Sequence, residues 1–194
     1  MSSPTDASHE HALIDGLRMG RLEVFRQIFE DYAMRLQRFA QLWVGADVAE
    51  DLVQDVLFDL WRRRDTLQVQ NGNLTAYLFS AVRNRVGMYA RHEHVSNRLT
   101  TANDDDVVSP GMGTSPVAPD EQVILDDFHV AMKAVMTQLS PLQRAVLLLR
   151  WTQGLSYGDI GTALSISENA ARHHMSRLRQ VLRPLLSDYI GPLE

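Results

Sequence analysis

Residues 156–179 constrain the fold of this chain most, because they read as two short helices joined by a tight turn. Ser156 is a favourable N-cap residue, and Asp159 three positions later supports the first turn of a helix. The chain turns at 165–166, and Ser167 can cap the second helix. The pattern predicts a helix-turn-helix, a motif that places its second helix in the major groove of DNA.

The second helix of this motif has one apolar face and several polar ones. Ala171, Met175 and Leu178 recur at helical spacing and form the face that we expect to be buried. The remaining faces carry Arg172, His173, Ser176, Arg177 and Arg179. These side chains favour DNA binding, although an ordinary helical hairpin with solvated arginines would show the same pattern.

The composition is that of a globular protein without disulfides. Of the 194 residues, 45% are hydrophobic and 22% are charged, and there is no cysteine. The lack of cysteine excludes a disulfide framework and thiolate metal sites. The first residues lack the basic and apolar blocks of a signal peptide, and no apolar run approaches the length of a membrane span. We therefore expect a cytoplasmic protein that does not insert into membranes.

The net charge of −5 is unevenly distributed along the chain. Residues 1–97 carry 11 arginines against 13 acidic residues, and residues 98–127 carry one arginine against seven acidic residues. Residues 128–194, which include the predicted helix-turn-helix, carry seven basic residues against four acidic ones. An acidic chain is poorly suited to hold DNA by phosphate contacts alone, which suggests a larger partner that supplies part of the DNA affinity.

The rest of the sequence is also helical in pattern, which predicts an all-α protein. We expect residues 1–10 to be disordered. Helices are predicted over 11–19, 22–44 and 123–139. Three further helices are predicted to start at the Asp47–Glu50 cap pair, at Asn73 and at Ser140.

One predicted helix, which ends at the arginines 62–64, carries an acidic ridge. Asp51, Asp55 and Asp59 are spaced four residues apart and align along the helix, with Gln54 beside them. Like charges at this spacing destabilise a helix, so a basic partner surface is the natural compensation. A solvated acidic face without a partner is the alternative.

The helix predicted from Asn73 combines basic and aromatic side chains. Its apolar side includes Tyr77, and its other side carries Arg83, Asn84 and Arg85. Single-stranded nucleic acid needs cations for its phosphates and rings on which its bases stack. The alternative is a pair of core tyrosines opposite a solvated arginine face.

Residues 98–121 break the helical pattern. They contain the acidic run 104–106, followed by a stretch rich in serine, glycine and proline. Such a segment is too long for an unstructured loop within one compact domain. We therefore predict two small helical domains joined by a flexible acidic linker. The predicted boundaries are 1–20 for an N-terminal tail and short helix, 21–97 for the first domain, 98–121 for the linker and 122–194 for the helix-turn-helix domain.

No constellation for catalysis or metal binding stands out in the sequence. Paired histidines at 9/11 and 92/94 are two residues apart, point to different sides of a helix and have no third ligand. There is no glycine-rich phosphate loop, nucleophile elbow or pair of catalytic carboxylates. We expect no cofactor, no metal and no enzymatic activity.

Three segments together resemble the extracytoplasmic-function (ECF) sigma factors, the small two-domain class of bacterial initiation factors. They are AEDLVQDVLFDLWRRR at 49–64, NLTAYLFSAVRNRV at 73–86 and LSPLQRAVLLLRWTQGLSYGDIGTALSISENAARHHMSRLR at 139–179. The resemblance spans about residues 20–186. It is specific, because two domain signatures occur in the order and spacing of the family. It implies a protein that binds core RNA polymerase and directs promoter-specific transcription initiation.

The resemblance also implies roles for the residues described above. The acidic ridge would dock on the polymerase β′ clamp, and the linker would thread the RNA exit path. The loop 66–72 and the helix after it would melt the −10 element and hold an unstacked base. The second domain would read the −35 element, with the β flap as a further polymerase contact. The implied polymerase-binding residues are Asp51, Gln54, Asp55 and Asp59; the −10 residues are Arg64, Asn73, Tyr77, Arg83, Asn84 and Arg85; the −35 residues are Ser167, Asn169, Arg172, His173, Ser176 and Arg177.

One departure from the family concerns the recognition helix. Family members often carry a basic residue, serine and arginine where this chain has Arg172, His173 and His174, which leaves the preferred −35 sequence open. The main alternative function is a stand-alone helix-turn-helix regulator that binds an effector through residues 1–97. We also hypothesise that the free protein is held inactive, either by an anti-sigma partner or by closure of its two domains on each other.

Overall fold

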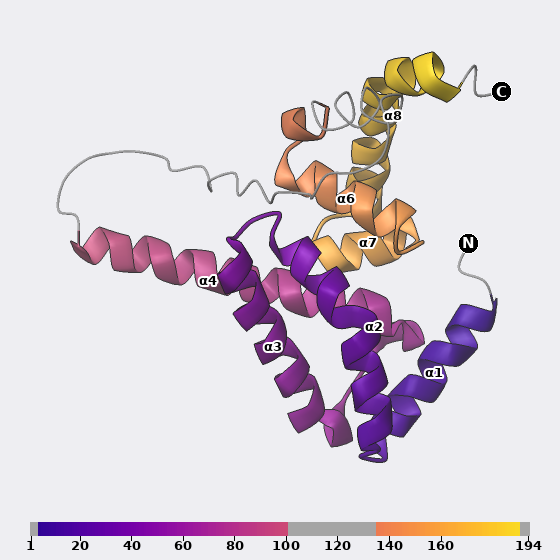
Figure 1. The fold of residues 1–194 in the computed structure, drawn as a ribbon, viewed down its shortest axis with the longest axis vertical. Coiled ribbons are helices and arrows are strands. Elements are labelled where there is room, and N and C mark those ends of the chain that lie inside the picture. The colour runs from indigo at the N-terminus through magenta and orange to yellow at the C-terminus, as the bar shows by residue number, and fades with distance from the viewer. Residues whose placement is uncertain (1–3, 101–134, 191–194) are drawn as a thin grey trace, which may run out of the picture.

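The computed structural model describes residues 4–100 and 135–190, with side chains described within 8–92 and 135–183. Every regular element in these ranges is a helix (Figure 1), which confirms the predicted all-α class. Most of the predicted linker at 98–121 and of the predicted helix at 123–139 lies outside the described residues. The division into two domains with a flexible linker therefore stays a prediction.

The helices form two groups along the chain. The first group is α1 (Pro4–Arg18), α2 (Leu22–Ala40), α3 (Ala46–Arg62), the 3-10 turns η1 (Arg64–Thr66) and η2 (Gln70–Gly72), and α4 (Leu74–Thr100). The second group is α6 (Pro141–Trp151), α7 (Tyr157–Leu164) and α8 (Glu168–Ile190). We call these groups the first and the second unit.

Helix starts in the second unit follow the predicted capping chemistry. Ser140 and Gln143 form a reciprocal capping box, and Pro141 occupies the first turn of α6. The Ser156 hydroxyl accepts a hydrogen bond from the backbone N–H of Asp159 at the start of α7. These predictions are confirmed, since each side chain acts on donors within three residues of itself.

Several predicted boundaries in the first unit are wrong. α1 begins at Pro4, so residues 4–10 are helical, because the helix is anchored by the buried side chains of Leu13, Ile14 and Leu17. α2 ends at Ala40 and turns replace the helix predicted to reach 44. α3 starts at Ala46 after Gly45, without the predicted cap pair of Asp47 and Glu50.

One contiguous hydrophobic core runs through both units. α2 packs against α3 and α4, α7 packs against α8 and α6, and α7 also lies along α4 (Figure 1). The contact between α4 and α7 joins the two units and is the most extensive helix pairing in the described residues. The two units are therefore packed against each other in this structure.

Candidate functional site

The exposed side of α3 carries acidic and apolar side chains together. One side of α3 is buried in the core through Leu52, Val56 and Leu60, so its opposite side is exposed. Asp51, Gln54 and Asp55 are exposed there, and we call these three residues the acidic face. Phe58 lies on the same helix with 63% of its surface exposed. This side of α3 therefore presents one apolar ring together with carboxylates and an amide.

Asp59 differs from the rest of the predicted ridge because it is held by two arginines. One carboxylate oxygen lies 3.0 Å from the guanidinium of Arg62, and the other lies 2.7 Å from that of Arg85 on α4. Both Asp59 and Arg85 are only partly exposed. This pair ties α3 to α4, so the predicted polymerase residue Asp59 and the predicted −10 residue Arg85 neutralise each other.

Two predicted −10 arginines rest on tryptophan rings in the first unit. The Arg64 guanidinium lies 4.6 Å from the ring centre of Trp61, and that of Arg83 lies 4.9 Å from the ring centre of Trp43. Burial lowers the pKa of Arg83, and the Nε atoms of both arginines are buried without a hydrogen-bond partner. Asn84, in contrast, is exposed.

The loop before α4 is sharply bent. Asn71 and Gly72 both have positive φ angles, 54° and 66°, a conformation that glycine and asparagine tolerate best. The Asn73 side chain accepts a hydrogen bond from the backbone N–H of Ala76, which confirms its predicted role as N-cap of α4. Tyr77 follows in the first turn of α4 and is half-buried, and burial raises the pKa of its hydroxyl. Asn73 and Tyr77 therefore lie one helical turn apart at the start of α4.

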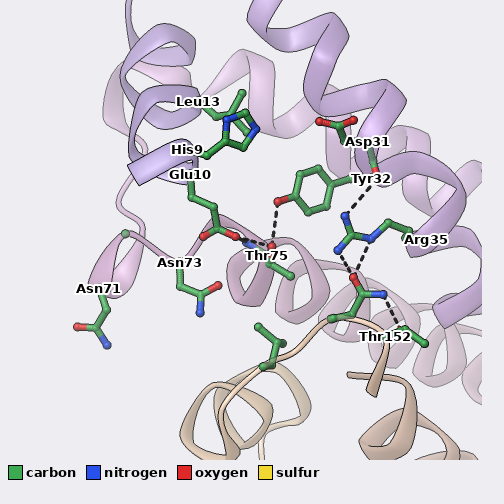
Figure 2. A pocket seen from close by; sticks show the side chains of 13 residues that line it. His9, Glu10, Leu13, Asp31, Tyr32, Arg35, Asn71, Asn73, Thr75 and Thr152 are labelled. Atoms are coloured by element: carbon green, nitrogen blue, oxygen red, sulfur yellow. Dashed lines mark hydrogen bonds between the residues drawn. The ribbon is translucent and has the colours of Figure 1, made fainter. Parts of the chain in front are cut away.

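Sequence reasoning did not identify Glu10, whose carboxylate reaches the start of α4. One oxygen accepts a hydrogen bond from the backbone N–H of Leu74 at 2.8 Å, and the other accepts the Thr75 hydroxyl at 2.5 Å. The Thr75 oxygen also lies 2.9 Å from the hydroxyl of Tyr32 on α2 (Figure 2). These partners are more than 40 residues apart in the chain, so no local pattern could reveal them.

The helix-turn-helix depends on a close approach of two backbone segments. Ser165 ends α7 in the left-handed conformation, and Ser167 caps α8 by accepting the backbone N–H of Ala170. A Cβ atom on Gly161 would lie only 2.8 Å from the carbonyl oxygen of Ile166. The turn therefore requires glycine at position 161 for space rather than for a special φ angle.

The outward side of α8 displays the predicted −35 residues. Exposed side chains there are Ser167, Asn169, Arg172, His173, Ser176 and Arg177. The predicted apolar face of Ala171, Met175 and Leu178 is buried, which confirms the register of this helix. The structure thus brings the predicted −35 set together on α8 and its N-cap residue Ser167.

Arg172 is held within the second unit. Its guanidinium lies 4.8 Å from the ring centre of Tyr157 and donates hydrogen bonds to the carboxylate of Glu168. His174 is half-buried, and its Nδ1 atom has no hydrogen-bond partner. Of the two histidines that depart from the family pattern, only His173 is exposed.

A polar cavity of ≈ 430 Å³ lies where the two units meet. Glu10, Tyr32 and Thr75 line it from the first unit, and Thr152 and Gln153 line it from the second (Figure 2). The described side chains include no cluster of three or more acidic or histidine residues arranged to bind a metal. Within residues 4–100 and 135–190, none of the helices combines the length and apolar character needed to cross a membrane.

Two family models match the chain in succession. Residues 28–94 match the model described as Sigma-70 region 2, and residues 129–182 match the model described as Sigma-70, region 4. The first match runs from within α2 into α4, and the second includes the helix-turn-helix.

Curated relatives and a solved structure extend over most of the chain. The ECF RNA polymerase sigma factor SigL of Mycobacterium tuberculosis is 28% identical over 176 residues, which cover 90% of this chain and 93% of that protein. The ECF RNA polymerase sigma factor BldN of Streptomyces coelicolor is 23% identical over 188 residues, which cover 96% and 69%. The sigma factor RpoE of Bartonella quintana, solved with the anti-sigma factor NepR, is 29% identical with a TM-score of 0.53, and the match covers 84% of this chain and 96% of that one.

Proposed function

This chain belongs to the ECF sigma factors, and from that membership we propose how its surfaces divide the work of transcription initiation. It binds core RNA polymerase and promoter DNA and directs initiation. The observation that carries this function is the succession of the two sigma-70 regions, each on its own helical unit. We propose that it catalyses no reaction itself and acts in the cytoplasm beside the polymerase.

We propose that the acidic face binds the β′ clamp of core RNA polymerase. Its carboxylates are exposed and spaced along one helix, and the exposed ring of Phe58 adds an apolar contact. Asp59 contributes less, because its charge is already compensated by Arg62 and Arg85.

A charge reversal tests this assignment. Asp55→Arg is expected to weaken binding to core polymerase at least tenfold, since like charges then face each other across the interface. Glu30→Arg reverses an exposed charge on α2 and serves as the matched control. Equal polymerase affinity of both variants would contradict the role of the acidic face.

We propose that the loop 66–73 and the first turns of α4 hold an unstacked base of the −10 element. Support comes from the sharply bent loop, from the polar side chains of Asn73 and Asn84, and from Tyr77 as a stacking ring. The arginines at 64 and 83 would contribute positive potential from their positions on tryptophan rings.

We propose that α8 reads the −35 element in the major groove. Its exposed residues include bidentate donors in Arg172 and Arg177 and smaller polar groups in Asn169 and Ser176. The second unit would also contact the β flap, and the linker, which lies outside the described residues, would follow the RNA exit path. We propose an anti-sigma factor as a further partner, since the solved relative is bound to one.

Run-off transcription tests the function as a whole. Core polymerase with the purified chain is expected to initiate at a cognate promoter, at which core polymerase alone is silent. A chain that only modulates an already competent holoenzyme would instead be a helix-turn-helix regulator, and the proposal would fail.

A further inference from the structure

Two neighbouring residues of α1 contact the end of the loop 66–73 and the start of α4. The Glu10 carboxylate bonds the backbone N–H groups of Leu74 and Thr75, and a Cβ atom on Gly72 would lie 2.4 Å from the ring of His11. α1 precedes the region matched by the sigma-70 region 2 model, which begins at residue 28. The loop 66–73 is therefore held from outside that region.

The first turn of α4 has its donors satisfied from two directions. The N–H groups of Leu74 and Thr75 donate to Glu10, and that of Ala76 donates to the side chain of Asn73. A carboxylate at this position also suits the positive end of the helix dipole. Loss of the Glu10 charge would leave the N–H groups of two buried residues with a weaker acceptor.

The contact continues from α4 into α2 through one hydroxyl. The Thr75 hydroxyl has a single proton, which it donates to Glu10, so the Tyr32 hydroxyl must donate to the Thr75 oxygen. Figure 2 shows the three groups converging from three helices. Because Thr75 and Tyr32 are buried, these hydrogen bonds fix the loop relative to the core of the first unit.

We propose that Glu10 is a positioning residue for −10 recognition, which sets the geometry of the loop 66–73 and of Tyr77 through the first turn of α4. This inference rests on the proposed function of the loop. It assigns to α1 a part in base capture, although the Glu10 carboxylate itself touches no base.

The sign of the electrostatic effect separates positioning from direct contact. Removing a carboxylate near nucleic acid should strengthen phosphate binding, because a repulsion is lost. If Glu10→Gln instead weakens binding, the loss of a phosphate repulsion is excluded as the main effect. The Thr75 variants described below keep the carboxylate and so separate positioning from a direct contact between Glu10 and a base.

The experiment uses holoenzyme assembled from core polymerase and the full chain. The probe is a fluorescent single-stranded oligonucleotide with the non-template −10 sequence of a promoter that the wild type transcribes. Glu10→Gln is expected to lower its affinity on the order of tenfold, the size of losing one charge-assisted hydrogen bond. The slope of log affinity against log salt should stay unchanged, because each lost phosphate contact would reduce it by about 0.7.

Asp15→Asn is the matched control. It removes the same charge from the same helix, at an exposed residue whose ion-pair partner is Arg18 within α1. Core polymerase affinity should be the same for wild type, Glu10→Gln and Asp15→Asn. Glu10→Gln binding the probe as tightly as the control would overturn the proposal. Failure of the wild type itself to bind the probe would instead refute the −10 function of the loop.

A second pair of variants decides the matter if Glu10→Gln unfolds the chain. Thr75→Val removes the hydroxyl at nearly constant volume, whereas Thr75→Ser keeps it. Thr75→Ser should bind the oligonucleotide like the wild type, and Thr75→Val should bind several-fold more weakly at equal polymerase affinity. Equal binding by the two variants would overturn the proposal.

Discussion

At the scale of single residues, Arg172 has partners that compete with DNA. Its guanidinium is held by the Tyr157 ring and by Glu168, so it must leave them to reach a base edge. We predict that Arg172→Ala costs about 1–3 kcal/mol of binding free energy at one base step of the −35 element. Titration of duplexes with single substitutions in the −35 element, read out by fluorescence anisotropy, measures this loss.

Arg177 provides the comparison for this prediction, since it is exposed on the same helix. If Arg177 holds a phosphate, Arg177→Ala should weaken all duplexes alike and reduce the salt slope by about 1. An Arg172→Ala variant with unchanged affinity and sequence preference would refute the base contact.

The Tyr32 hydroxyl makes stability depend on alkaline pH. Burial, with Glu10 as a smaller cause, raises its pKa above the ordinary value near 10. Below pH 10 the hydroxyl is protonated in the folded and unfolded chains, and its contribution is complete. Above pH 10 the unfolded chain loses this proton first, so the unfolding free energy falls with pH. Tyr32→Phe should cost about 1 kcal/mol at pH 8 and show a shallower alkaline decline.

Urea unfolding between pH 8 and pH 11 checks both parts of this prediction. Tyr77 also has a pKa raised by burial, and its contribution to the decline is common to both chains. Parallel curves for wild type and Tyr32→Phe would show that Tyr32 is not the titrating group.

At the scale of elements, α7 carries a matched pair of glycines, one of which packs against the turn that leads into α8. A Cβ atom on Gly161 would press on the Ile166 carbonyl oxygen, whereas one on Gly158 would meet side-chain atoms at an ordinary 3.7 Å. Gly161→Ala should therefore cost about 1–3 kcal/mol by overpacking, and it should tilt α8 and weaken −35 binding. Gly158→Ala should be neutral or stabilise by up to about 1 kcal/mol, because alanine favours helix. Thermal unfolding and −35 duplex binding of the two variants decide between these outcomes.

Local chemistry explains which elements the sequence could predict. Ser140, Ser156 and Asn73 cap their helices through donors three residues away, so their roles were readable in the chain. The apolar face of α2 was less readable: Phe29 is 45% exposed, while Ile28 beside it is fully buried. Both are apolar, and only packing against other helices chooses between them.

The candidate site shows the same division between local and distant effects. The helical spacing of the apolar residues in α8 predicts which of its sides faces outward, and all six predicted −35 residues lie on the surface. The neutralisation of Asp59 by Arg85 and the grip of Glu10 on Leu74 join segments 26 and 64 residues apart. Such contacts depend on tertiary geometry, which helical periodicity does not encode.

At the scale of the whole molecule, the packing of the two units conflicts with promoter reading. The −10 and −35 elements are about 25 base pairs apart, which is roughly 85 Å of B-form DNA at ~3.4 Å per base pair. Here α7 lies along α4, and Arg35 of α2 donates to the side-chain oxygen of Gln153 at 2.7 Å. We expect that one chain cannot keep this contact and also span both elements, so the packed arrangement should be inactive.

A reversible lock would test whether the packed arrangement is inactive, and the chain has no cysteine to interfere. We predict that a variant with Arg35→Cys and Gln153→Cys, joined by a short disulfide-containing bis-maleimide linker, loses promoter-directed transcription in proportion to the linked fraction. Its acidic face stays exposed, so core polymerase should still bind it, and reduction of the linker should restore transcription. The unlinked variant lacks the hydrogen bonds between Arg35 and Gln153, which add to the packing of α4 against α7 in joining the units. It should therefore show a larger radius of gyration than the wild type in solution scattering, with transcription at least equal. A linked protein that initiates as well as the unlinked one would show that the contact between α4 and α7 persists on the promoter, and the geometric argument for inactivity would be wrong.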